Sequence, residues 1–118
     1  MARSTPESVV SKAVIEYLDK LMDGGAPIYY EHRSGSGGFS YKKGVPDLWI
    51  TVNGIHVEVE LKSSKGKLST MQEKFKWRCE NIFKCMYWNP YGFVEFKFLL
   101  DRLLYQTTNK KDLLGSDT

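Results

Sequence analysis

The chain has 118 residues, the length of one domain with a modest hydrophobic core. Hydrophobic residues make up 42% and charged residues 26% of it, which excludes an intrinsically disordered chain. The net charge of +3 permits a polyanionic partner without requiring one. No apolar run approaches the ~18 residues of a membrane span, and the N-terminus lacks the apolar core of a signal peptide, so we expect a cytoplasmic protein.

The first predicted element is a helix over residues 6–22. A proline and a glutamate at its start suit the first turn and the positive end of the helix dipole, and apolar residues follow at helical spacing. Two glycines and a proline end it. A short strand is expected over 28–33, followed by a glycine-rich loop over 34–38.

The centre of the chain predicts a β-hairpin. Strands over 47–52 and 55–62 flank an Asn-Gly pair, which favours a two-residue turn. In the returning strand, alternation places Glu58, Glu60 and Lys62 on one face and apolar residues on the other.

The C-terminal part predicts a helix that ends near Phe83, a strand over 84–88 and a terminal helix over 91–105. The alternation at the start of this last segment also fits a strand. The polar tail 106–118 is expected to be frayed. The order of elements predicts a single-domain α/β fold, with a central mixed β-sheet flanked by α-helices on both sides.

The two cysteines, Cys79 and Cys85, lie six residues apart, with no second pair and no neighbouring histidine. That spacing does not suggest a zinc site. Because a signal peptide is not apparent, a structural disulfide is not expected either. We therefore predict two reduced thiols. Both histidines of the chain are expected to be solvated.

The predicted hairpin brings chemically useful side chains together. Pro46 cannot donate to a strand ladder, which places Asp47 at the start of a strand, and the turn brings Asp47 to the same end as Glu60 and Lys62. Two carboxylates suit a hard cation such as Mg²⁺ or Mn²⁺, which lowers the pKa of a bound water. A lysine can orient that water or stabilise developing negative charge. This pattern is also typical of a solvated strand face, but its spacing favours phosphodiester hydrolysis.

Pro46-Asp47 followed by Glu60-Leu61-Lys62 resembles the signature of the PD-(D/E)xK nuclease superfamily. The resemblance to its VRR-NUC branch covers most of the chain and is carried by Gly44-Val45-Pro46-Asp47-Leu48, Val59-Glu60-Leu61-Lys62, Gly66-Lys67-Leu68-Ser69 and Gln72. It implies a restriction-endonuclease-like core. It also implies a stand-alone, single-domain nuclease, commonly phage-encoded and similar to Holliday-junction resolvases.

The resemblance adds further site residues. It implies a glutamate on the first helix that points into the metal site, for which Glu7 is our first choice. Glu16 is the alternative, about two and a half turns away on the opposite side of the helix. Gln72 resembles the glutamine that supports the lysine or a metal-bound water, although its spacing from a serine also fits a helix cap. Glu58 lies on the same face of the strand as Glu60. It is expected either to support the metal ligands from behind or to be a ligand itself.

DNA contacts are predicted from basic residues in the loops that flank the site. These residues are Arg33, Lys42, Lys43, Lys65 and Lys67. A polyanion needs such charges, although any one of them is equally well explained as an ordinary surface cation. No motif for reading bases is present, so recognition of DNA shape is expected.

The expected function is that of a metal-dependent, structure-selective DNA endonuclease that acts on branched DNA such as four-way junctions. The resemblance also implies a homodimer, whose two-fold symmetry would suit paired cuts in opposed strands. The alternatives are a catalytically inactive junction-binding module and a sequence-reading restriction-type enzyme. Each expected catalytic position carries a suitable residue type, which argues against an inactive module. The lack of a separate recognition domain argues against a restriction-type enzyme.

Overall fold

The computed structural model describes residues 6–33, 44–63 and 66–115. In chain order its elements are α1 (Glu7–Asp23), β1 (Ile28–His32), β2 (Leu48–Val52), β3 (Ile55–Val59), α2 (Thr70–Arg78), the π-helical turn η2 (Cys79–Phe83), β4 (Met86–Trp88) and α3 (Phe93–Gly115). The loop predicted over 34–38 lies outside the described residues, as do Lys42, Lys43 and Lys65.

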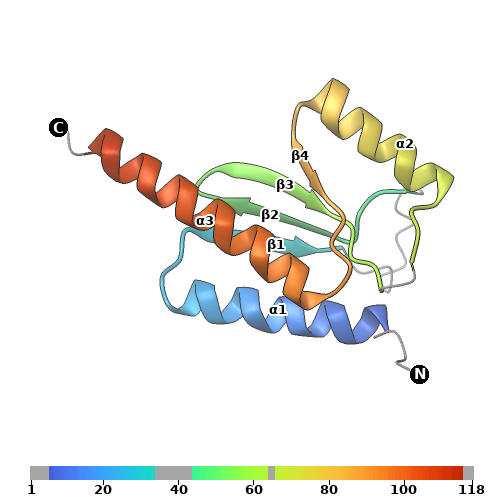
Figure 1. Cartoon of the computed structure of the whole chain (residues 1–118), viewed down its shortest axis with the longest axis horizontal. Coiled ribbons are helices and arrows are strands. Elements are labelled where there is room, and N and C mark those ends of the chain that lie inside the picture. Colours follow the sequence, from blue (N-terminus) through green and yellow to red (C-terminus); the bar gives the residue numbers. More distant parts are fainter. Residues whose placement is uncertain (1–5, 34–43, 64–65, 116–118) are drawn as a thin grey trace.

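The strands form one mixed sheet in the order β1-β2-β3-β4 (Figure 1). β1, β2 and β3 pair antiparallel, and β4 pairs parallel to β3. The β2–β3 connection is the predicted turn: Asn53 and Gly54 both have positive φ, 51° and 85°, as a type I′ hairpin turn requires. The predicted α/β class, mixed sheet and hairpin are confirmed.

α1 and α3 pack on one face of this sheet and against each other (Figure 1). α1 contributes Val10, Val14 and Leu18 at helical spacing, and α3 contributes Phe96 and Leu100, all of them buried. These side chains meet the apolar residues of β2 and β3. Since side chains alternate along a strand, burying this set fixes which residues of β3 turn away from the core.

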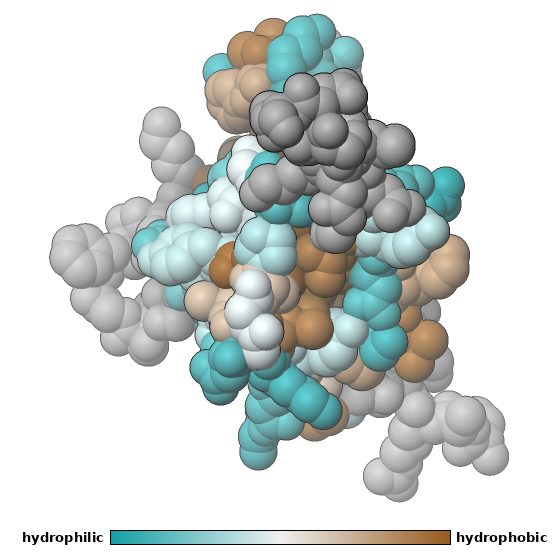
Figure 2. Space-filling model, turned by 90° about the vertical axis from the view of Figure 1, so that its left-hand side faces the viewer, coloured by the Kyte–Doolittle hydropathy of each residue, from teal (hydrophilic) through white to brown (hydrophobic). Residues whose placement is uncertain are grey.

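α2 lies apart from this core, beyond β4 (Figure 1). None of its residues is buried, and it approaches the other side of the sheet through Phe75, whose ring centroid lies 6.4 Å from that of Tyr87. The segment of α2 and η2 stands at the top of the molecule, where hydrophilic and hydrophobic side chains lie side by side (Figure 2). The predicted helical cover is therefore extensive on one face of the sheet and sparse on the other.

The terminal segment is a helix, as favoured over a strand, and it is longer than the sequence predicts. α3 continues to Gly115, through most of the tail 106–118 for which fraying is expected. Asn53 Nδ2 donates to Thr107 Oγ1 at 2.8 Å, so the hairpin turn fastens the helix beyond its predicted end. Of the helices in the described residues, none combines the length and apolarity of a transmembrane segment.

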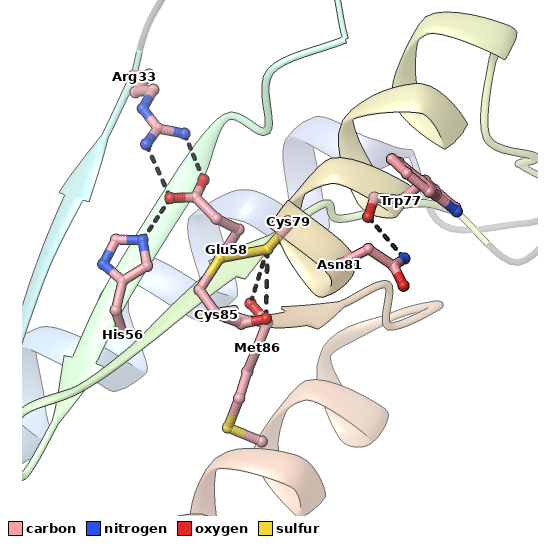
Figure 3. Close-up of a disulfide and its surroundings, with 8 residues drawn as sticks. All are labelled: Arg33, His56, Glu58, Trp77, Cys79, Asn81, Cys85 and Met86. Carbon is pink, nitrogen blue, oxygen red and sulfur yellow. Dashed lines mark hydrogen bonds and ion pairs between the residues drawn. A yellow bond between two sulfur atoms is a disulfide. The ribbon is translucent and has the colours of Figure 1, made fainter. Parts of the chain in front are cut away.

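Cys79 and Cys85 form a disulfide (Figure 3), so the prediction of two reduced thiols is wrong. The chain between them makes the π-helical turn and then reverses at Lys84, which adopts a left-handed conformation with φ 59°. This reversal brings the two Cα atoms to 5.5 Å, within the range of a disulfide. The pairing thus depends on a local backbone conformation that spacing rules do not capture.

Candidate active site

Glu60 and Lys62 follow directly after β3, and their backbone pairs with the chain at the end of β4 and just after it. Glu60 N donates to Trp88 O at 2.9 Å, and Lys62 N donates to Pro90 O at 3.2 Å. These bonds extend the strand pairing past Val59 and preserve the alternation, since Leu61 joins the core. The predicted Glu-x-Lys pair is therefore held by its backbone on both sides of a buried leucine.

The carboxyl group of Glu60 is buried within a cluster of charges. Glu60 is 3% exposed, and its Oε1 has no hydrogen-bond partner in the part of the chain that the structure describes. Its pKa is raised to about 7, first by burial and next by the negative charge of Asp47, with a contribution from Glu7; the positive charge of Lys62 acts in the opposite direction. The sequence-predicted residues therefore lie close enough to act on one another electrostatically.

Asp47 stands directly before β2, with its backbone fixed and its side chain exposed. Arg33, at the end of β1, donates its backbone N–H to Asp47 O. Its guanidinium Nη1 donates to Pro46 O at 2.7 Å. The backbone on both sides of the Pro46–Asp47 bond is thus anchored while the Asp47 carboxylate stays open to solvent.

The same guanidinium is paired with Glu58 (Figure 3). Arg33 Nη1 and Nη2 lie 2.7 and 3.1 Å from the two carboxylate oxygens of Glu58, and His56 Nε2 contacts one of those oxygens. Glu58 is 5% exposed, and a buried carboxylate needs such partners to offset its desolvation. Glu58 is therefore occupied by internal partners, which favours its position behind Asp47 over direct ligation.

The contacts of Glu58 alter the roles expected for Arg33 and His56. Arg33, which the sequence places among the DNA contacts, is engaged with Glu58 and Pro46. The side chain of His56 is 40% exposed, in keeping with the expected contact with solvent, but it is also held between Glu58 and the ring of Trp49, with ring centroids 5.2 Å apart. Lys67 is exposed, as a DNA contact requires.

The two candidate carboxylates of α1, Glu7 and Glu16, differ in their effect on Glu60. The charge of Glu7, the first residue of α1, contributes to the raised pKa of Glu60, whereas Glu16 does not figure among the causes of that shift. Across residues 6–33, 44–63 and 66–115, however, no three His, Cys, Asp or Glu side chains are arranged to hold a metal ion. Glu7 is thus near the cluster without completing a preformed three-carboxylate site.

Lys62 is half-buried, and its stem is supported by Gly66. A Cβ atom at position 66 would lie 3.2 Å from Lys62 Cβ and 3.1 Å from Lys62 Cδ. Gly66 N also donates to Ser63 O at 2.9 Å, which ties Gly66 to the residue after the lysine. The missing side chain of Gly66 therefore lets its backbone pack directly on the lysine stem.

Gln72 has the capping role that its spacing predicts. Gln72 N donates to Ser69 Oγ at 3.2 Å, and Ser69 N donates to Gln72 Oε1 at 2.8 Å. These two bonds form the reciprocal capping box at the start of α2. Support of Lys62 or of a metal-bound water by Gln72 stays a prediction.

Gly44 joins the start of α2 to the loop that carries Asp47. Its φ is +88°, and a Cβ atom there would lie 2.3 Å from Met71 O. Only glycine permits this backbone approach. Gly44 was singled out by the resemblance alone, and its contact with α2 is the physical reason for a glycine at this position.

Tyr87 is a neighbour of the site that sequence reasoning missed. β4 places it beside Glu58 in the sheet, and its hydroxyl is buried without a hydrogen-bond partner among the described residues. Burial, followed by the charges of Glu60 and Glu58, raises its pKa. The Tyr87 hydroxyl therefore stays protonated beside the carboxylates. Alternation in β4 could have indicated its face, but not its neighbours.

No family model, curated protein or solved structure matches the chain. The site is therefore interpreted from its own chemistry. It combines a buried carboxyl group whose pKa is near neutrality, an exposed carboxylate with an anchored backbone, and a lysine with a supported stem. Two such carboxylates fit a hard cation that keeps most of its water ligands.

Proposed function

We propose that this chain is a divalent-metal-dependent DNA endonuclease with a restriction-endonuclease-like core of the VRR-NUC type. The observation that carries the proposal is the buried carboxyl group of Glu60, whose Oε1 has no hydrogen-bond partner within the described residues, beside the charges of Asp47 and Lys62. Burying such a group without a partner is costly. Groups whose pKa is shifted by burial and by named charges cluster at functional sites.

In this proposal Asp47 and Glu60 hold Mg²⁺ or Mn²⁺, with Glu7 at the margin of the site. The bound cation supplies an activated water and neutralises charge on the scissile phosphate. Glu60 must lose its proton to serve as a ligand, and its pKa of about 7 allows this near neutral pH. Asp47, exposed at the start of β2, approaches from the solvent side, where a phosphodiester can reach it.

Lys62 acts on the reacting phosphate. Its ammonium group orients the attacking water or stabilises the negative charge that develops in the transition state. Such stabilisation depends on a fixed position, and the packing of Gly66 on the lysine stem limits its movement. The resemblance to VRR-NUC nucleases assigns Gln72, whose side chain caps α2, a further role in supporting Lys62 or a metal-bound water.

The proposed substrate is branched DNA such as a four-way junction, cut by a homodimer. This part of the proposal rests on the resemblance of the sequence motifs to stand-alone VRR-NUC nucleases. A symmetric pair of sites would place equivalent cuts on opposed strands.

A cleavage assay tests the proposal. The purified chain is incubated with Mg²⁺ or Mn²⁺ and with labelled four-way junctions or linear duplexes, beside Asp47→Ala and Lys62→Ala. Lys12→Ala, at an exposed position of α1, is the control. We expect metal-dependent cleavage of the junction, and a loss of about 100-fold or more in both site variants. Junction binding without cleavage would support the inactive module, and cleavage of linear duplex at one sequence would support a restriction-type enzyme.

A further inference from the structure

The outward face of α2 is not used by the fold. α2 spans nine residues, has a complete capping box and contains no buried residue. Phe75 faces the body of the protein, with ring centroids 6.4 Å from Tyr87 and 6.3 Å from Phe83. At about 100° per residue, Lys74, Trp77 and Arg78 share a different side of the helix. All three are exposed, and Trp77 is 59% exposed.

The segment around α2 is also basic. Residues 67–84 contain five basic and two acidic side chains, a surplus equal to the net charge of +3 of the whole protein. The basic residues are Lys67, Lys74, Lys76, Arg78 and Lys84. Within the described ranges, none of them takes part in an ion pair. Their charges are therefore available to a negatively charged partner.

The start of α2 lies against the loop that precedes Asp47. Gly44 packs on Met71 O so closely that no side chain fits between them. The capping box of Ser69 and Gln72 fixes the direction in which the helix leaves this contact. A ligand bound along α2 would therefore be held in a defined position relative to Asp47.

We propose that the face of Lys74, Trp77 and Arg78 is a docking surface for DNA beside the candidate active site. Lys74 and Arg78 bind backbone phosphates, and the indole of Trp77 stacks on a base that is unpaired or exposed at a branch point. Cations and an exposed aromatic ring are the two elements by which proteins bind unstacked nucleic acid. The inference rests on the proposed nuclease function and assigns the element that holds its substrate.

A second copy of the chain fits this surface less well than DNA. A two-fold interface sets a surface against itself, so Lys74 and Arg78 would meet the same basic residues of the other copy. Like charges placed together across an interface oppose association. A polyanion, in contrast, gains from the release of its counterions when these side chains bind.

The test measures DNA binding without metal, so that cleavage plays no part in it. Fluorescence anisotropy with a labelled four-way junction in EDTA, at several salt concentrations, compares Lys74→Ala/Arg78→Ala and Trp77→Ala with the wild type. Lys12→Ala/Lys20→Ala removes the same charge from exposed positions of α1 and is the matched control. Circular dichroism and sedimentation accompany each variant.

We expect the double α2 variant to lower the slope of log K against log salt by about 1.8, or ~0.9 per phosphate contact. Trp77→Ala should weaken junction binding about 10-fold or more, with a smaller effect on linear duplex and no change in the control. Wild-type affinity and slope in both α2 variants would overturn the inference even if the enzyme cuts DNA. A dimer that dissociates in these variants would also overturn it, by showing a protein interface. Binding that needs α2 but is never followed by cleavage would support the inference and contradict the nuclease.

Discussion

Arg33 is joined to Glu58 by two hydrogen bonds of 2.7 and 3.1 Å, and its Nη1 also lies 2.7 Å from Pro46 O. One guanidinium thus connects the end of β1, a buried carboxylate of β3 and the residue before Asp47. The planar fork of arginine is suited to this geometry, because it offers several donors in fixed directions. The exposed Asp47 side chain therefore projects from a backbone that is held from within the sheet.

Removal of the guanidinium should be costly. Arg33→Ala leaves the Glu58 carboxylate buried with His56 as its remaining side-chain partner among the described residues, and we expect a loss of about 3–5 kcal/mol in the free energy of unfolding. Urea denaturation at pH 7 measures this loss. Arg33→Lys keeps the charge without the planar fork of donors, so its free energy of unfolding should lie between those of the wild type and Arg33→Ala. Arg33→Ala/Glu58→Gln should recover part of the stability, and a loss below about 1 kcal/mol in Arg33→Ala alone would contradict a structural ion pair.

Glu60→Gln should stabilise the protein at alkaline pH. The pKa of Glu60 is raised from its ordinary value of 4.5 to about 7. Between these values the folded protein keeps a proton that the unfolded chain has lost, so stability falls as pH rises through the window. The loss is on the order of 3 kcal/mol. The neutral amide avoids it, so the variant should match the wild type near pH 4.5 and exceed it near pH 8.

Thermal denaturation in metal-free buffer across this range provides the measurement. A variant that is equally destabilised at every pH would show that the carboxyl group is needed for packing, and would argue against a desolvated acid. The same variant should have lost metal-dependent cleavage, since an amide is a poor substitute for a carboxylate ligand.

Ionisation of the buried Glu60 lowers the stability of the folded protein, and a bound metal ion should restore it. We expect Mn²⁺ to raise the Tm of the wild type near pH 8, because a ligand that binds the folded state alone stabilises it. The effect should fade towards pH 5, where the proton competes for Glu60. Glu60→Gln and Asp47→Asn should both lose the response. Glu16→Gln, on an exposed position of α1, is the matched control and should retain it. An equal response in all four proteins would place the metal elsewhere.

The hairpin and the grouping of Asp47, Glu60 and Lys62 at one end of it were predictable because their determinants are local. The Asn-Gly pair specifies the turn, and alternation then brings Asp47 towards Glu60 and Lys62. What sequence patterns do not contain is the environment of each group. Glu60 and Glu58 look alike in the sequence, yet one lacks a hydrogen-bond partner for its Oε1 in the described residues and the other is paired with Arg33, 25 residues away.

The missed features depend on a local backbone conformation in one case and on a tertiary contact in the other. The disulfide requires a left-handed residue at Lys84, a conformation that a lysine side chain does not favour. α3 outlasts its apolar pattern, and a contact from Asn53 holds it at Thr107, beyond the predicted end at residue 105; such tertiary contacts override composition. Periodicity could therefore locate the elements of this chain, but not the contacts that set their ends.

Gly44 and Gly25 offer a matched pair for the contact between α2 and the Asp47 loop. Both have positive φ, +88° and +90°, but a Cβ atom at Gly25 meets nothing within 4 Å, whereas one at Gly44 would lie 2.3 Å from Met71 O. Gly25→Ala should therefore show the cost of the backbone conformation alone, about 1–2 kcal/mol by urea denaturation. Gly44→Ala should cost more, because α2 must move away from the loop. Its Mn²⁺-induced rise in Tm should also shrink, since the loop positions Asp47. If the two alanine variants lose equal stability and keep equal metal responses, the α2 contact has no part in holding Asp47 in place.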